Sequence, residues 1–223
     1  MEQKKQKGTG GMKNILCYGD SNTYGLKPGM TGRYARDIRW AGLLQKFLGD
    51  GYYVIEEGLG GRTTVWDDPI EEHKNGKAYL LPCLDSHKPL DLVVIMLGTN
   101  DLKKRFSLPV CDIAWGMENL IKTILKSESG NAGSAPQVLL IAPVPITNVG
   151  NRDWCLMFGD GMENSNFLAG EYEQVAKRNA VHFLNPGKSV EVGSEDGLHY
   201  TRAGHRKMAE LVAQKVKEIF PQE

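Results

Sequence analysis

Short polar blocks near both ends of the chain carry residue types that could perform nucleophilic chemistry. Ser21 ends a Gly-Asp-Ser block that follows an apolar run, and residues 196–199 read Asp-Gly-Leu-His. A serine hydroxyl becomes an effective nucleophile only when a base accepts its proton, and a carboxylate can orient that base. Ser21, His199 and Asp196 are therefore the candidate nucleophile, base and orienting group for acyl transfer.

Two further blocks could supply the hydrogen-bond donors that acyl transfer also needs. Residues 58–63 (Gly-Leu-Gly-Gly-Arg-Thr) and 98–101 (Gly-Thr-Asn-Asp) each follow a predicted strand. A glycine brings its backbone N–H close to the oxyanion without a Cβ in the way, and an asparagine amide is a neutral donor. Asn100 and either Gly60 or Gly61 therefore join the Ser21 backbone N–H as a candidate oxyanion hole.

Each of these residues also fits an ordinary structural role. Gly-Asp-Ser suits a turn or helix cap, Asp196 precedes a glycine, Asn100 could cap a strand end, and His199 could start a helix. The presence of all the blocks together favours the chemical interpretation. Asp20 and Asp101 are interpreted as structural, each bonding backbone groups in its own loop. The remaining histidines lack a carboxylate three residues earlier in a glycine-containing loop and are interpreted as structural or solvated: His73, His87, His182 and His205.

The order of the blocks resembles the SGNH hydrolases, also called the GDSL esterase/lipase superfamily, which are named for catalytic Ser, Gly, Asn and His. The resemblance spans residues 14–220, and segments 56–64, 90–93 and 95–101 are similar to the bacterial arylesterase and acyltransferase branch. It implies that Gly61 is the oxyanion glycine, that no cofactor is needed, and that the protein forms a homo-oligomer. Asn22 departs from the family's usual leucine, and we expect it to alter none of these roles.

Hydrophobic periodicity predicts the elements that position these blocks. Mostly continuous apolar runs, typical of strands buried on both faces, occupy residues 14–18, 53–57, 92–97, 137–142 and 181–184. Amphipathic helical patterns cover residues 37–48 and 112–126, and a last helix starts at Thr201. This alternation predicts an α/β, three-layer doubly wound sandwich with a five-stranded parallel sheet of flavodoxin-like order 2-1-3-4-5. In that order the loops carrying Ser21, Gly61 and Asn100 emerge side by side.

Composition limits the partners and the compartment. Lys and Arg together number 27, as do Asp and Glu, so no basic field favours nucleic acid. We expect one domain over residues 12–223 and a disordered extension over residues 1–11, which show no secretory signal pattern. No apolar run is long enough to cross a membrane. The cysteines have no metal-ligand spacing and are expected to be reduced thiols, so no metal and a cytoplasmic location are predicted: Cys17, Cys83, Cys111 and Cys155.

Aromatic residues in the loops after the predicted strands could line a substrate pocket. These are Tyr24, Phe106, Trp154 and Phe158. A subunit contact or a small satellite core is an alternative for all of them. Two longer stretches, residues 64–81 and 143–164, are predicted to be irregular. We expect the second, called the insert below, to narrow the approach to Ser21 and to help build a subunit interface.

Together these features predict a serine carboxylester hydrolase that acts on small, short-acyl esters through an acyl-enzyme and also passes acyl groups to alcohols. A carbohydrate O-acetylesterase is the alternative within the enzymes, because the blocks do not encode the leaving group. A catalytically silent α/β binding domain is the alternative from another class, and the complete set of candidate residues argues against it. No phosphate-binding glycine motif follows the first strand.

Overall fold

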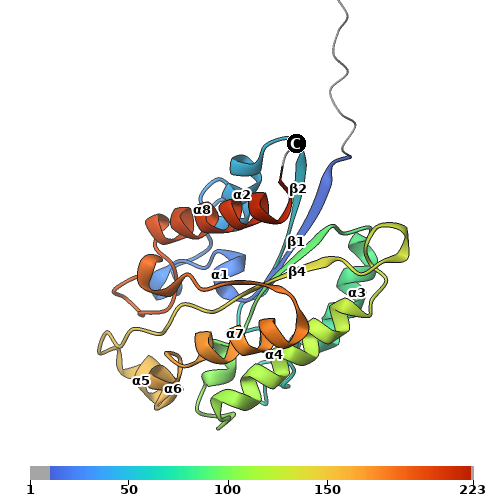
Figure 1. The fold of residues 1–223 in the computed structure, drawn as a ribbon. Coiled ribbons are helices and arrows are strands. Elements are labelled where there is room, and N and C mark those ends of the chain that lie inside the picture. The colour runs from blue at the N-terminus through green and yellow to red at the C-terminus, as the bar shows by residue number, and fades with distance from the viewer. Residues whose placement is uncertain (1–10, 222–223) are drawn as a thin grey trace, which may run out of the picture.

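The computed structural model describes residues 11–221, so almost all of the expected N-terminal extension lies outside the described residues. One parallel sheet of five strands has the order β2-β1-β3-β4-β5, which confirms the predicted order (Figure 1). The strands are β1 (Lys13–Gly19), β2 (Tyr52–Gly58), β3 (Leu92–Met96), β4 (Gln137–Ile141) and β5 (His182–Leu184). The helices are α1 (Ser21–Tyr24), α2 (Trp40–Leu48), α3 (Gly76–His87), α4 (Val110–Leu125), α5 (Arg152–Phe158), α6 (Gly161–Asn164), α7 (Leu168–Asn179) and α8 (Arg202–Ile219). Short 3-10 turns are η1 (Pro28–Met30), η2 (Asn100–Leu102), η3 (Asn131–Gly133) and η4 (Gly187–Ser189).

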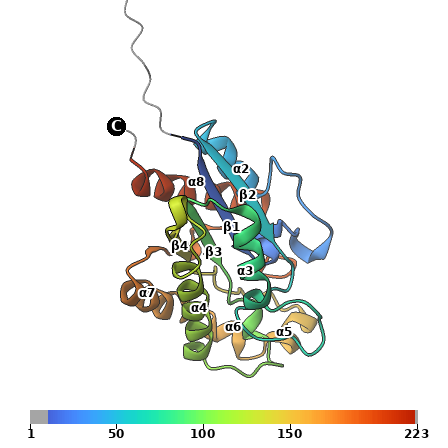
Figure 2. The same ribbon diagram turned by 90° about the vertical axis from the view of Figure 1, so that its right-hand side faces the viewer.

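Helices cover both faces of the sheet and complete the predicted three layers. Helices α2 and α8 pack on one face, while α3, α4 and α7 pack on the other (Figure 1). Figure 2 views the molecule from the side that carries α3 and α4. Successive strand residues point to opposite faces, so Val93 and Ile95 belong to one core and Leu92 and Val94 to the other. This explains why the strands read as continuous apolar runs.

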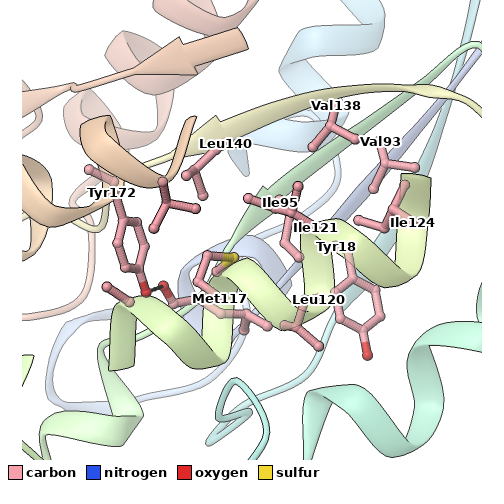
Figure 3. Packing of buried hydrophobic residues seen from close by; sticks show 14 of the residues in the cluster. Tyr18, Val93, Ile95, Met117, Leu120, Ile121, Ile124, Val138, Leu140 and Tyr172 are labelled. Carbon is pink, nitrogen blue, oxygen red and sulfur yellow. Dashed lines mark hydrogen bonds between the residues drawn. The ribbon is translucent and has the colours of Figure 1, made fainter. Parts of the chain in front are cut away.

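The larger core lies between the sheet and α4 (Figure 3). Its fully buried side chains on α4 recur at helical spacing: Met117, Leu120, Ile121 and Ile124. They face Val93, Ile95, Val138 and Leu140 of β3 and β4. Burying each aliphatic side chain of this size contributes about 1.5–3 kcal/mol relative to leaving it exposed. This packing holds β3 in place, and the loop that follows β3 carries Asn100.

The sequence prediction differs from the structure mainly in the two stretches expected to be irregular. Helix α3 begins within the first stretch, and its start is capped by Asn75, whose side chain accepts the Lys77 N–H. Pro82 lies inside α3, and few of its residues are buried, so the helix has no clear apolar stripe. Helices α5 and α6 occupy part of the insert, near the carboxyl ends of the strands (Figures 1 and 2). Helix α2 also begins at Trp40, later than the predicted residue 37.

The register of the sheet brings the ends of the central strands to one level. Gly19, the last residue of β1, pairs with Gly58 at the end of β2 and with Met96 at the end of β3. The segments that follow these residues carry Ser21, Gly61 and Asn100. Within the described residues, no helix is both long and apolar enough to cross a membrane.

Candidate active site

Ser21 is the first residue of α1, a single helical turn at the carboxyl end of β1. The Asp20 side chain caps this turn by accepting the Asn22 N–H at 2.9 Å, as expected for a residue that bonds its own loop. A Cβ on Gly58 would lie 2.1 Å from the backbone nitrogen of Tyr24, so α1 packs directly on the end of β2. Ser21 is 7% exposed and therefore sits in a largely desolvated place.

An unbroken chain of hydrogen bonds joins Ser21, His199 and Asp196. The Ser21 Oγ lies 3.0 Å from His199 Nε2, and His199 Nδ1 lies 2.8 Å from Asp196 Oδ2. When Nδ1–H donates a hydrogen bond to the carboxylate, Nε2 carries no proton and can accept that of the serine hydroxyl. The structure thus brings Ser21 from near the start of the chain to the Asp196–His199 pair near its end, in the geometry that a serine nucleophile requires.

The Asp196 carboxylate is fully engaged. Its Oδ1 accepts the backbone N–H groups of Leu198 (3.0 Å) and His199 (2.9 Å), and its Oδ2 also accepts the Gly29 N–H at 2.7 Å. Burial alone would raise the pKa of Asp196, but the hydrogen bonds from His199 and Leu198 hold that pKa below its usual value. Sequence reasoning did not identify Gly29 as a partner of Asp196. The local sequence shows only a Pro28-Gly29 pair, which indicates a turn.

The insert contacts the loop that carries His199. Gly197 has a φ of 66°, and a Cβ there would lie 1.8 Å from the Thr147 carbonyl oxygen, so only glycine fits. The Thr147 N–H donates to the Gly197 carbonyl at 2.8 Å. The Trp154 ring meets the His199 ring edge-to-face with centroids 5.9 Å apart. The insert therefore covers one side of the candidate base.

The candidate oxyanion donors have free hydrogens. The Ser21 N–H, at the start of α1, and the Gly61 N–H have no protein acceptor within residues 11–221. Asn100 lies in η2, and its Nδ2 donates one hydrogen to the Arg62 carbonyl at 3.1 Å, which leaves the second hydrogen. These are the groups that an oxyanion hole would use.

The backbone at Gly61 gives a reason for glycine beside the one that we expected. The sequence argument was that a Cβ would obstruct the reacting group. In the structure, Gly61 has a φ of 80°, and a Cβ there would lie 2.8 Å from Glu71 Oε2 and 3.2 Å from Lys74 Cε. The positive φ therefore favours glycine at this position, while the Glu71 and Lys74 side chains are flexible and could move away from a Cβ.

Arg62 binds the main chain just before the candidate nucleophile, a role that sequence reasoning missed. Its side chain is buried, donates to the Gly19 carbonyl at 2.8 Å and stacks on Tyr18, with the guanidinium carbon 4.1 Å from the ring centroid. This ties the loop after β2 to the residue that ends β1. The only sequence signal was an arginine directly after the glycine pair.

The prediction that Asp101 bonds its own loop is wrong. Its carboxylate accepts the Thr64 backbone N–H at 3.0 Å and also the Thr64 hydroxyl, so it joins the loop after β3 to the loop after β2. Two loops that belong to different strands are thereby held together. Burial raises the pKa of both Asp101 and Asp20 to about 6.

The structure places the predicted pocket aromatics in different settings. Trp154 alone contacts His199, and it stacks on Phe158 at 5.8 Å, while Phe158 is itself almost fully buried and lines a hollow of about 360 Å³ beside η2. Tyr24 stacks under the Arg33 guanidinium at 4.0 Å. Phe106 is half-buried in the turn after η2. A pocket role for these residues stays a prediction.

Three neighbouring side chains outside this site are of the kinds that bind metal ions. Glu57, Cys83 and His87 have ligand atoms within 4.8 Å of one another. His87 Nε2 is already paired with Glu57 Oε1 at 2.8 Å. Burial, reinforced by the charge of Glu57, raises the pKa of the Cys83 thiol to about 12 and so disfavours the thiolate that a metal binds. We assign no metal to this group.

Comparison with known proteins agrees with this geometry. A model of the GDSL-like lipase/acylhydrolase family matches residues 17–207. The aryl esterase structure of M. smegmatis is 40% identical, with a TM-score of 0.89 over 93% of this chain and 100% of that one. A carbohydrate acetylesterase structure from Sinorhizobium meliloti is 39% identical, with a TM-score of 0.89 over the same shares. An acetylxylan esterase of Xylanibacter ruminicola is 28% identical over 91% of this chain, which spans only 43% of that protein. The chain belongs to the GDSL-like lipase/acylhydrolase family and is an SGNH-type esterase.

Proposed function

We propose that Ser21 is the nucleophile of a carboxylester hydrolase, that His199 is its general base and acid, and that Asp196 orients the imidazole. The observation that carries the proposal is the continuous hydrogen-bond chain from Ser21 Oγ through the His199 ring to Asp196 Oδ2. The esterase activity of the family agrees with it.

The reaction divides into acylation and deacylation. The Ser21 hydroxyl proton moves to His199 Nε2 as Oγ bonds to the ester carbonyl carbon and the carbonyl electron pair moves onto oxygen. When the tetrahedral intermediate collapses, the alcohol or phenol leaves with the proton from Nε2. Water then gives a proton to the same nitrogen as its oxygen bonds to the acyl carbon. Collapse of this second tetrahedral intermediate releases the acid, and Nε2 returns the proton to Ser21 Oγ. These steps need no cofactor.

The developing negative charge is the part of the reaction that fixed donors accelerate most. We assign this task to the backbone N–H groups of Ser21 and Gly61 and to Asn100 Nδ2. Support comes from the free hydrogens of all three groups and from strand ends that lie at one level. Arg62 and Asp101 hold the three loops in this arrangement.

We further propose that the substrates are small, short-acyl esters and that alcohols compete with water for the acyl-enzyme. The insert supports this proposal, because Trp154 lies against His199 and limits the space beside it. A partly covered, apolar site excludes some bulk water.

A carbohydrate O-acetylesterase is the second candidate. It is favoured by similar proteins that are named for acetylated carbohydrates, among them the two described above. Relative turnover of acetylated sugars and aryl acetates separates this activity from the first.

We also propose that the protein acts in the cytoplasm as a homo-oligomer. All four cysteines are free thiols in the structure, which suits a reducing compartment: Cys17, Cys83, Cys111 and Cys155. Exposed Leu156 and Met157 on α5 offer apolar surface to a second subunit.

Replacing the nucleophile tests the proposal directly. Ser21→Ala removes one oxygen at the end of β1 and opens no cavity in either core, so the fold should persist while ester turnover is lost. A fluorophosphonate probe, which reacts with activated serines, should label the wild type and not the variant. Labelling or turnover that survives in the folded variant would identify another nucleophile and overturn the assignment.

A further inference from the structure

The side-chain amide of Asn22 is shared between the two segments that carry the candidate nucleophile and base. Its Nδ2 donates to the Leu198 carbonyl at 3.2 Å, and its Oδ1 accepts the Tyr200 N–H at 3.1 Å. These are the residues on either side of His199. Asn22 is only 5% exposed, so water does not compete for either bond.

Apart from the bond to Ser21 Oγ, the hydrogen bonds of His199 itself come from its own loop. The Gly193 N–H donates to the His199 carbonyl at 2.9 Å, and the Asp196 carboxylate accepts from both the backbone and the ring of His199. These contacts fix His199 relative to Asp196, but they do not fix it relative to Ser21. Asn22 directly follows Ser21 in the chain. Its side-chain amide therefore fixes the position of the main chain around His199 relative to Ser21.

We propose that Asn22 is a positioning residue, which holds the main chain on both sides of His199 so that Nε2 stays within hydrogen-bond reach of Ser21 Oγ. The inference rests on the proposed roles of Ser21 and His199. It differs from our expectation that Asn22, where the family usually has leucine, alters none of the catalytic roles.

The amide is the chemical group that this position requires. It must donate at one end and accept at the other, because it meets a carbonyl and an N–H. Leucine can do neither, and an ionised aspartate can only accept. Leu198 and Tyr200 are both buried, so without the amide their backbone groups would have no partner and no water. The segment would shift to recover these bonds and would take His199 with it.

Asn22→Leu tests the proposal by removing both bonds. We expect kcat for an aryl acetate, counted per active site, to fall about 10–100-fold, because a small misplacement of a reacting group has an effect of this size. KM should change far less, because the amide does not touch the substrate. The rate at which a fluorophosphonate labels Ser21 should fall by a similar factor. A purely structural role would lower the melting temperature and leave kcat per labelled site unchanged, and that result would overturn the proposal.

Asn22→Asp is the second variant and is nearly isosteric, so it answers the question if Asn22→Leu fails to fold. In its ionised form it keeps the acceptor for Tyr200 and loses the donor for Leu198, and kcat should again fall at least about tenfold. Matched controls are Asn131→Leu and Asn131→Asp. They remove a side-chain bond to Asp91, which precedes β3 at the amino ends of the strands and so lies far from the site. Both controls should retain full kcat.

His199→Ala, measured beside these variants, distinguishes a failure of the proposed function from a failure of the positioning role of Asn22. If His199→Ala retains turnover, the proposed function itself is rejected. If it is inactive while both Asn22 variants keep full kcat, only the positioning role of Asn22 is rejected.

Discussion

At the scale of single residues, the side chains of the candidate active site could be predicted from the sequence. The residues that hold these side chains in position could not. Ser21, His199 and Asn100 stand in recognisable blocks. Gly29 and Arg62 act through backbone groups of distant segments, namely the Gly29 N–H on Asp196 and the Gly19 carbonyl that Arg62 binds. Such contacts leave no spacing signal in the sequence, because the partner is set by the fold.

Asn100→Ala tests the oxyanion assignment. The substitution should lower kcat roughly 10²–10³-fold with a much smaller change in KM, because the donor matters most when the carbonyl oxygen becomes negatively charged. Steady-state kinetics on an aryl acetate would measure this, and Asn119→Ala on the exposed surface of α4 is the control. Turnover within a few-fold of the wild type would leave Asn100 as a loop residue that binds the Arg62 carbonyl.

At the scale of elements, the strands were predicted almost to the residue, because the central strands β1, β3 and β4 are largely buried on both faces and therefore almost continuously apolar. Helix α3 was missed, because few of its residues are buried and Pro82 interrupts its pattern. Helix α5 was missed because it is short, and its start depends on Asn151, whose side chain accepts the Asp153 and Trp154 N–H groups. Local caps and tertiary contacts, rather than periodicity, define these two helices.

His205 joins two elements and has a pH dependence of its own. It is fully buried on α8, and its Nδ1 accepts the Trp40 N–H at the start of α2 at 3.2 Å. Burial, with smaller effects of His199 and Arg39, lowers its pKa from 6.5 to about 3. Above pH 6.5 both folded and unfolded chains keep it neutral. Between pH 6.5 and 3 this histidine binds a proton in the unfolded chain but not in the folded chain. The protein therefore loses stability as the pH falls.

His205→Asn isolates this effect, because the asparagine oxygen can accept the Trp40 N–H and does not titrate. The stability advantage of the wild type over the variant should shrink by about 1.4 kcal/mol per pH unit between pH 6.5 and 3. Urea unfolding at pH 7.5 and 4.5 would measure this change. His73→Asn, at an exposed position, is the control. An advantage that is equal at both pH values would contradict the lowered pKa.

At the scale of the whole molecule, the insert has two different surfaces. Trp154 and Phe158 face inward, toward His199 and the core, while Leu156 is 62% and Met157 37% exposed. The sequence predicted that the insert contributes to both the approach to Ser21 and a subunit interface, but it could not divide the apolar residues between the two. That division depends on the turn of α5, which was not predicted.

Our proposal links substrate size and subunit number through the insert. We expect aryl acetates to be turned over at least about tenfold faster than the corresponding octanoates, because a pocket of limited size discriminates against added methylenes. Light scattering should give a mass above that of one chain, and Leu156→Glu should lower it. An acyl-length series on both proteins completes the test, and a monomer that prefers long acyl chains would contradict this account of the insert.

The level register of Gly19, Gly58 and Met96 has a consequence for engineering. The strand ends that present the chemistry are aligned by main-chain hydrogen bonds, which do not depend on the side chains of neighbouring loops. The insert instead meets the segments around the site through a few contacts, among them Trp154 against His199, the Thr147 N–H on the Gly197 carbonyl and the Asn151 amide on the Glu195 carbonyl. Acceptance of larger acyl groups can therefore be redesigned within residues 148–164, while the sheet keeps the reacting atoms in place.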